Sequence, residues 1–269
     1  MKENVLLSEE IREKIIAQMR EAGKIMLSAH GVEENAGEID EKAGTANFVT
    51  VYDVKVQNFL MEGLKELLPE AVFLAEEKDV QPENTQKGFC FVIDPIDGTT
   101  NFIHNYRCSV ISVGLLLDGE PYFGAVYNPY QDRVYSAVRG EGAFCNGKPI
   151  HVSKRDLSHA MISYGSTPYY KSTLTEATFG LMKELFLVGG DIRRSGSAAF
   201  DLCMVASGRS DVFFEMRLSP WDYAAGMLLI TEAGGWISRM DGTPLRVGDV
   251  CSVLAGNAVC REEVQKIAG

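Results

Sequence analysis

The sequence has little of what would place a protein in a membrane or on nucleic acid. No apolar run approaches the length of a membrane span, and the first ten residues, MKENVLLSEE, lack the apolar stretch of a signal peptide. Lys and Arg number 26 against 37 Asp and Glu, so the net charge is −11. Because a nucleic-acid binder needs a basic surface to offset phosphate charge, we expect neither general nucleic-acid binding nor membrane association.

Cysteine and histidine patterns are also sparse. The six cysteines are scattered, form no C-x-x-C pair, and have no histidine at metal-ligand spacing. Scattered thiols without a signal peptide favour a reducing compartment, so we expect a cytoplasmic protein. The sequence contains no G-x-x-x-x-G-K-[ST] motif, which argues against an NTP-driven kinase.

The composition that remains is typical of a folded globular protein. The chain has 269 residues, of which 46% are hydrophobic and 23% charged, enough for one large domain or two ordinary ones. There is no internal repeat and no Pro/Ser linker. The patterning changes near residues 150–160, which predicts an α+β half over residues 1–152 and an α/β half over residues 153–269.

In the first half, apolar residues at helical spacing predict helices over residues 8–29 and 53–68, with Ser8 as the first N-cap. Strands are predicted over residues 72–75, 88–94, 108–117, 122–127 and 133–138. The dipeptides Asp118-Gly119 and Asn146-Gly147 are typical of tight turns, and therefore predict an antiparallel sheet.

In the second half, strands and helices alternate. The predicted strands are residues 161–164, 212–215, 236–240 and 251–254, and the predicted helices are residues 174–187, 197–207 and 221–233.

The stretch FVIDPIDGTTNF places two aspartates three residues apart after an apolar run. The run predicts a buried strand that ends at Asp94, because Pro95 lacks an amide hydrogen and cannot continue a central strand. The chain then turns and can bring Asp97 beside Asp94. Two such carboxylates are unfavourable unless a cation joins them or one is protonated. Oxygen ligands suit Mg²⁺ or Mn²⁺, with the Ile96 carbonyl as a third ligand.

The residues that follow, Gly98, Thr99 and Thr100, offer backbone amides and hydroxyls. If a helix or tight turn begins there, the amides face the place where an anion would lie. Taken alone, however, the motif favours a simpler interpretation, in which an Asp-Pro turn and an Asp-Gly turn are capped by threonines.

Two distant segments add carboxylates. Glu76 follows a predicted strand, and Asp222 lies in the first turn of a predicted helix. Each has an ordinary explanation by itself, the first as a solvated loop residue and the second as an acid favoured by the helix dipole. Together with Asp94 and Asp97 they offer enough ligands for two or three metal ions, and two ions can hold the attacking and leaving oxygens of a phosphoryl displacement.

The motif D-P-I-D-G-T-T-N-F, an upstream Glu-Glu pair and a downstream W-D-x-A-A-G together resemble the inositol monophosphatase family, a Mg²⁺-dependent, lithium-sensitive group within the sugar-phosphatase superfamily. The resemblance covers nearly the whole chain, and includes Lys42, Thr50 and Asp53 and the blocks at residues 140–150, 196–215 and 221–235. It implies a layered αβαβα sandwich with two long helices in the N-terminal half.

The resemblance also implies metal ligands. Glu76, Asp94 and the Ile96 carbonyl match the ligands of one Mg²⁺ ion. Asp94, Asp97 and Asp222 match those of a second ion, and Glu76 also faces a weaker third.

Other positions match catalytic and substrate-binding residues. Thr99, paired with Asp53, matches the residues that orient a metal-activated water together with Glu76. The residues matched to substrate binding are Gly98 and Thr99, for the phosphate, and Ser197, Ala198 and Glu215, for the substrate hydroxyls.

The implied function is Mg²⁺-dependent hydrolysis of myo-inositol 1-phosphate or a similar polyol or sugar phosphate, by a homodimer inhibited by lithium. Fructose 1,6-bisphosphate and 3′-phosphonucleotides remain alternative substrates, and a non-catalytic regulator is an alternative of another class, against which the intact acidic residues argue. The sequence departs from many members after His104, where Asn105-Tyr106-Arg107 replaces Phe-Pro. Arg107 either contacts a second phosphate or is a solvated loop residue, and the latter is favoured.

Overall fold

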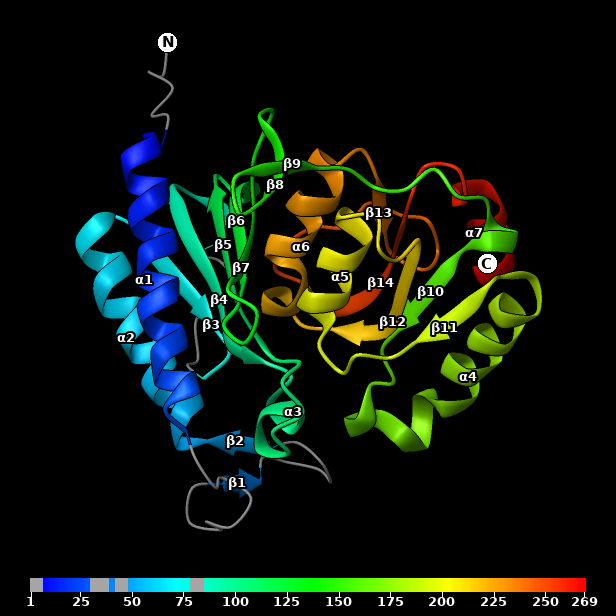
Figure 1. Cartoon of the computed structure of the whole chain (residues 1–269), viewed down its shortest axis with the longest axis horizontal. Helices are drawn as coiled ribbons and strands as arrows, with labels where there is room; N and C mark the ends of the chain where they lie inside the picture. Colours follow the sequence, from blue (N-terminus) through cyan, green and yellow to red (C-terminus); the bar gives the residue numbers. More distant parts are fainter. Residues whose placement is uncertain (1–6, 30–38, 42–47, 78–84) are drawn as a thin grey trace.

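The computed structural model describes residues 7–29, 39–41, 48–77 and 85–269, and Lys42 lies outside these ranges. The described residues form five layers in the order α-β-α-β-α (Figure 1), which confirms the predicted sandwich. From one outer layer to the other, the helices are α1 (Glu9–Leu27) and α2 (Val51–Leu67), then α5 (Ala198–Ala206) and α6 (Pro220–Glu232), and finally α4 (Lys171–Val188) and α7 (Arg261–Ala268).

The first sheet has seven strands in the order β3-β4-β5-β6-β7-β8-β9, antiparallel except for the parallel pair β3 and β4. Its strands are β3 (Val72–Ala75), β4 (Phe89–Asp97), β5 (Val110–Leu117), β6 (Glu120–Asn128), β7 (Arg133–Val138), β8 (Gly142–Cys145) and β9 (Lys148–Ile150). Asp118-Gly119 and Asn146-Gly147 form tight hairpins with positive φ at every turn residue, as predicted. Strand β1 (Ile39–Glu41) pairs antiparallel with β2 (Phe48–Thr50) in a separate two-stranded sheet.

Strand β4 does not end at Asp94, so the predicted strand end was wrong. Asp94 pairs with Ser112 and Asp97 pairs with Val110, and the register shifts between the two aspartates. Pro95 cannot donate a ladder hydrogen bond, and the chain accommodates it as a bulge within the strand. In a regular strand, residues three apart point to opposite faces. The bulge therefore accounts for both aspartates facing the same side.

The second sheet has five strands in the order β11-β10-β12-β14-β13, of which β11, β10 and β12 are parallel. Its strands are β10 (Met161–Tyr164), β11 (Asp191–Arg193), β12 (Val212–Leu218), β13 (Trp236–Ser238) and β14 (Cys251–Gly256). Strand β11 and helix α7 were not predicted, and β12 runs three residues beyond its predicted end. Two 3-10 helices, η3 (Leu157–His159) and η4 (Pro168–Tyr170), flank β10.

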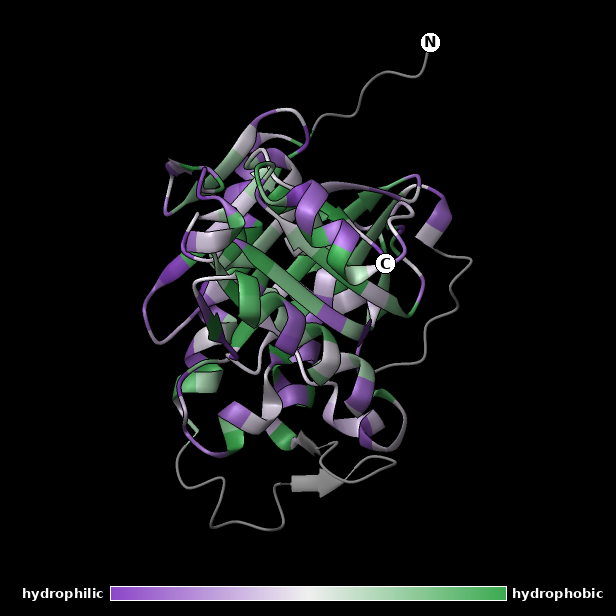
Figure 2. Cartoon of the chain, turned by 90° about the vertical axis from the view of Figure 1, so that its right-hand side faces the viewer, coloured by the Kyte–Doolittle hydropathy of each residue, from purple (hydrophilic) through white to green (hydrophobic). Residues whose placement is uncertain are grey.

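The core consists of apolar clusters on both faces of each sheet. Figure 2 shows hydrophobic residues along the interior strands and hydrophilic ones on the outer helices and loops. Small residues on α5 and α6, such as Ala199 and Ala225, are fully buried between the sheets, so these two helices lie close to both. None of the helices in the described ranges is long and apolar enough to cross a membrane.

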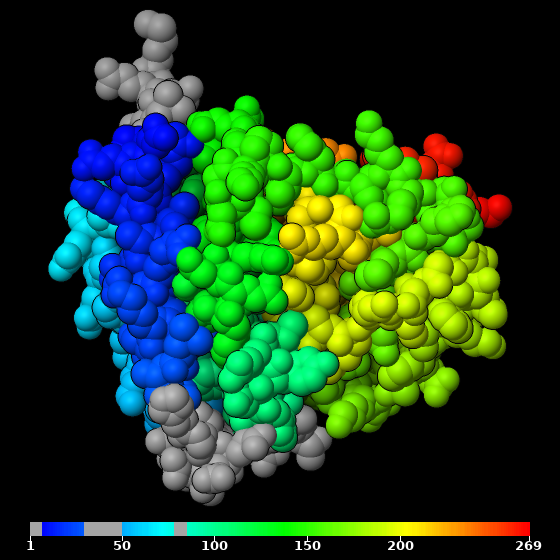
Figure 3. Space-filling view, in the orientation of Figure 1, coloured from blue at the N-terminus to red at the C-terminus, as the bar shows by residue number. Residues whose placement is uncertain are grey.

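The middle layer brings distant segments together. The surface of residues near 200 lies between residues of the first sheet and α3 (Thr99–Ile103) on one side and those of α4 on the other (Figure 3). The end of β4, the start of α3, the start of α5 and the start of α6 all contribute to one cleft.

Candidate active site

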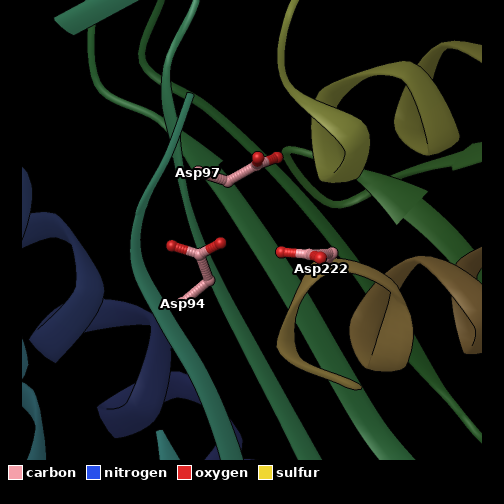
Figure 4. A group of neighbouring side chains, drawn as sticks. All are labelled: Asp94, Asp97 and Asp222. Carbon is pink, nitrogen blue, oxygen red and sulfur yellow. The ribbon is translucent and has the colours of Figure 1, made fainter. Parts of the chain in front are cut away.

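Three aspartates from two chain segments meet at the end of β4. Asp94 and Asp97 extend from β4 and Asp222 from the first turn of α6, and their carboxylates lie next to one another (Figure 4). One carboxylate oxygen from each lies within 4.8 Å of the others. Asp94 and Asp97 are buried and Asp222 is half-buried. The structure thus brings together three of the residues predicted to bind metal.

Burial makes this arrangement electrostatically unfavourable without a cation. Burial is the largest cause that raises the pKa of each group, to about 6 for Asp97 and well above the ordinary value for Asp94 and Asp222. At Asp94 and Asp222 the neighbouring carboxylates raise the pKa further. A divalent cation would remove this repulsion, and a donor set made of oxygen atoms fits Mg²⁺ or Mn²⁺.

Hydrogen bonds orient each aspartate through one oxygen. Oδ1 of Asp94 accepts from the Ile96 amide at 3.0 Å, which fixes the bulge. Oδ2 of Asp222 accepts from the Ser219 amide at 2.7 Å, in a capping box at the start of α6. Such a box satisfies backbone donors that a helix start leaves unpaired, so the fold itself sets the direction of Asp222.

Asp97 is held by the start of α5. Its Oδ2 accepts from the Ser197 hydroxyl at 2.7 Å and from the Ala199 amide at 2.6 Å. These bonds favour the charged carboxylate and lower its pKa against the effect of burial.

Glu76 lies just after β3 and lines the same cleft. Its backbone amide donates to the carbonyl of Ile93 at 3.2 Å, which keeps this residue next to β4. Its charge contributes to the raised pKa of Asp94, Asp222 and Asp53. The fourth predicted acidic ligand is therefore close enough to interact with the cluster.

Thr99 and Asp53 are in contact. The Thr99 hydroxyl lies 3.2 Å from Oδ1 of Asp53 and 3.2 Å from the Ile96 carbonyl, so its hydrogen is shared between two acceptors. Oδ2 of Asp53 accepts from the Thr50 amide and hydroxyl, because Thr50 and Asp53 form the capping box of α2. Burial raises the pKa of Asp53 to about 7. Thr99 lines the cleft, whereas Asp53 lies behind it.

Gly98 directly precedes α3. A helix therefore begins at the Gly98-Thr99-Thr100 segment, which is one of the two conformations considered for it. The φ of Gly98 is +91°, a left-handed conformation that favours glycine. A Cβ at this position would lie 3.2 Å from the carbonyl oxygens of Cys108 and Gly196. Both the backbone conformation and the close packing therefore require glycine next to the aspartates.

The wall of the cleft also contains the predicted substrate-binding residues Ser197, Ala198 and Glu215. Oε1 of Glu215 accepts from the Thr167 amide at 3.0 Å and from its hydroxyl at 3.2 Å. Burial raises the pKa of Glu215 to about 7. The segment that follows β10 thus fixes this carboxylate against the wall.

The cleft has a volume of about 510 Å³ and contains residues that the sequence did not single out. Among the residues that the structure describes, six carboxylic acids and two arginines line it. The additional residues include Thr167, Tyr169, Tyr170, Arg194, Asp201 and Arg217. Arg194 and Asp201 lie close in sequence to Ser197, and this proximity was a signal that could have identified them. Thr167, the tyrosines and Arg217 have no such local signal. Arg107 does not line the cleft, which agrees with the solvated interpretation.

The family model described as "Inositol monophosphatase family" matches residues 7–268. The chain belongs to the inositol monophosphatase family. It is accordingly a phosphatase of the inositol monophosphatase type, as the motifs predicted.

Individual relatives support this assignment. The chain is 34% identical to fructose-1,6-bisphosphatase/inositol-1-monophosphatase of Aquifex aeolicus, over 92% of this chain and 94% of that one. It is 38% identical to the putative Nus factor SuhB of Neisseria meningitidis, over 86% and 88% of the two chains. The structure of staphylococcal SaIMPase-II with bound inositol monophosphate matches with a TM-score of 0.80 at 29% identity, over 96% and 92% of the chains.

Proposed function

We propose that the protein is a Mg²⁺-dependent phosphomonoesterase that hydrolyses myo-inositol 1-phosphate or a similar polyol or sugar phosphate. The observation that carries the proposal is the cluster of Asp94, Asp97 and Asp222 beside the start of α3, of which the first two are buried and the third is half-buried. A cation cluster with helix amides next to it suits a phosphate ester. The inositol monophosphate bound to the staphylococcal relative supports the choice of substrate.

The metal ions would be held by the three aspartates, by Glu76 and by the Ile96 carbonyl, as two or three Mg²⁺ ions, with Mn²⁺ as a substitute. When bound, they would supply Lewis-acid polarisation of the phosphoryl group and a lowered pKa for a coordinated water. Each aspartate is already oriented through one oxygen, so little rearrangement of the protein is needed to bind them.

The chain's own groups would then position the reactants. Glu76 and Thr99 orient the attacking water in line with the leaving oxygen, and Asp53 fixes the Thr99 hydroxyl from behind. The amides of Gly98 and Thr99 hold the phosphoryl oxygens as charge develops on them. Displacement requires no covalent bond between enzyme and phosphate.

Another part of the wall would hold the leaving group. Ser197, Ala198 and Glu215 line the same cleft as the aspartates, and we expect them to contact the hydroxyls of a polyol attached to the phosphate. A buried carboxylate such as Glu215 is a strong acceptor for substrate hydroxyls, and this favours a polyol over an apolar leaving group.

A second candidate substrate is a bisphosphate such as fructose 1,6-bisphosphate. Arg194 and Arg217 line the cleft, and the Arg217 guanidinium stacks 4.6 Å from the centre of the Tyr170 ring. A guanidinium held in this way suits a second phosphate. The name of the Aquifex relative includes both activities. A 3′-phosphonucleotide remains the other alternative.

A substrate panel with phosphate release measured at several Mg²⁺ concentrations tests the proposal. We expect turnover of inositol 1-phosphate that depends on Mg²⁺ and is inhibited by millimolar Li⁺. If fructose 1,6-bisphosphate were turned over faster than inositol 1-phosphate, and if this preference were lost in Arg217→Gln, the bisphosphate would be the substrate. Absence of phosphate release from every member would instead favour a non-catalytic regulator.

We further propose that the enzyme is a cytoplasmic homodimer. Light scattering of the purified protein at micromolar concentration tests the dimer, for which the expected mass is twice the 29.6 kDa of the chain. A mass equal to that of one chain would contradict it.

A further inference from the structure

Asp201 is a buried carboxylic acid that the proposed mechanism does not use. It lies in the first turn of α5 and lines the cleft, but is 3% exposed. Its Oδ2 accepts from the Ser195 hydroxyl at 2.7 Å. Burial raises the pKa of this carboxyl to about 8, and the charges of Asp97 and Glu215 add to the increase. Placing an acid here is therefore costly in electrostatic terms.

The hydrogen bonds continue from Asp201 to the metal ligand Asp97. The Ser197 amide donates to the Ser195 oxygen at 3.1 Å, and the Ser197 hydroxyl donates to Oδ2 of Asp97 at 2.7 Å. Ser195 thus links Asp201 to the residue that orients Asp97. Because Ser197 is the N-cap of α5, the same link sets the place of the Ala199 amide, which also donates to Asp97.

Asn101 anchors Ser195 from the opposite side. Its amide nitrogen donates to the Ser195 carbonyl at 3.0 Å and to the Cys108 carbonyl at 2.7 Å. Asn101 lies on α3, two residues after Thr99. Ser195 is consequently fixed both to the helix that carries Thr99 and, through Asp201, to the helix that holds Asp97.

We propose that Asp201 is a positioning residue that acts through Ser195 and Ser197 to hold Asp97 in its metal-binding orientation. The inference rests on the proposed function, in which Asp97 is a metal ligand. Groups that orient a metal ligand without touching the ion typically change metal affinity 10–100-fold when removed. Asp201 acts by accepting the hydrogen bond from Ser195. Its negative charge does not itself contribute to the affinity for the cations.

The test is the affinity of the metal-free protein for Mn²⁺. It is measured by titration calorimetry and, independently, by the electron paramagnetic resonance signal of the Mn²⁺ that stays free. We expect Asp201→Ala to weaken binding about 10–100-fold at one of the sites. Asp201→Asn keeps an oxygen acceptor of the same shape, so it should bind Mn²⁺ nearly as well as wild type. If the charge of Asp201 attracted the ions instead, the Asn and Ala variants would be equally defective.

Ser195→Ala provides an independent variant. It should weaken Mn²⁺ binding as much as Asp201→Ala does, and the double variant should be no worse than either single one, because both remove the same link. Val205→Ala, a buried change on the same helix that does not line the cleft, is the matched control. It should lower thermal stability while leaving Mn²⁺ affinity unchanged.

Wild-type affinity in both Asp201→Ala and Ser195→Ala would overturn the role of Asp201, and so would an Asn variant as weak as the Ala variant. Failure of the proposed function looks different. If wild type bound no Mn²⁺, or if Asp97→Asn left every site intact, the metal assignment itself would fall, and this inference with it.

Discussion

At the scale of single residues, the carboxylates of the cleft are balanced between two opposing effects. Burial favours the protonated form, whereas hydrogen bonds from Ser197 and Ala199 to Asp97, and from Thr167 to Glu215, favour the charged form. The net result is a pKa of about 6 for Asp97 and about 7 for Glu215. We therefore expect both carboxyl groups to be ionised near neutral pH once cations are bound.

These pKa values predict how the stability of the metal-free protein depends on pH. The folded-state pKa values of Asp97, Asp53 and Glu215 lie above the ordinary values of 3.8 to 4.5. Between about pH 4 and 7 the folded state then binds more protons than the unfolded state, so the free energy of unfolding should fall as pH rises. Urea unfolding in the presence of EDTA at pH 5, 6, 7 and 8 measures this change in the free energy of unfolding.

Glu215→Gln is the control for the pH experiment, since it removes one of the titrating groups and should make the decrease shallower. Unfolding free energy that stays constant or increases between pH 5 and 8 would contradict the electrostatic description of the cleft.

The sequence identified the residues whose chemistry is visible in a motif. Asp94, Asp97 and Asp222 were predicted to lie together, and they do. Thr167 and Tyr169 could not be predicted, because they follow β10, which pairs with the strand that carries Glu215, and ordinary Thr and Tyr residues carry no signal of that pairing.

At the scale of elements, β4 shows why the ends of strands were less predictable. A proline after an apolar run normally stops a strand, but here the pairing with β5 resumes at Asp97 and Val110 after the bulge. Tertiary pairing thus overrides the local preference of Pro95. Strand β11 has only three residues, which is shorter than the run of about four to eight alternating residues that predicts a strand.

The segment after β10 gives a prediction at this scale. A Cβ at Gly165 would clash with Oε2 of Glu215. Gly165→Ala should therefore displace Glu215 from the wall, raise KM for the polyol phosphate, and leave the Mg²⁺ concentration needed for half-maximal activity unchanged. Steady-state kinetics at varied substrate and Mg²⁺ measure both quantities.

Gly180→Ala is a matched control for that change, because Gly180 lies within α4 and a Cβ there meets nothing within 4 Å. It should leave KM unchanged and stabilise the protein by up to about 1 kcal/mol, since alanine is a better helix former than glycine. An unchanged KM in Gly165→Ala would show that Glu215 does not hold the substrate.

At the scale of the whole molecule, the cleft depends on both sheets and on the helices between them. Asp94 and Asp97 come from the first sheet, Glu215 from the second, and Asp222 from the middle layer. The predicted division at residues 152 and 153 falls between β9 and β10, and it stays a prediction. Neither half by itself contains all of the proposed metal ligands, so the proposed activity belongs to the intact chain.

The most direct test of this account is phosphate release from inositol 1-phosphate by Asp94→Asn over a range of Mg²⁺ concentrations. Asp94 is the residue shared by both proposed ions, so its loss should reduce Mg²⁺-dependent turnover by about 10²-fold or more. The variant should remain folded, and without metal it should be more stable than wild type, because one buried like charge is gone. Asp241→Asn, an exposed change outside the cleft, should retain wild-type turnover. Unchanged turnover in a folded Asp94→Asn protein would contradict the assignment of this cluster as the catalytic metal site.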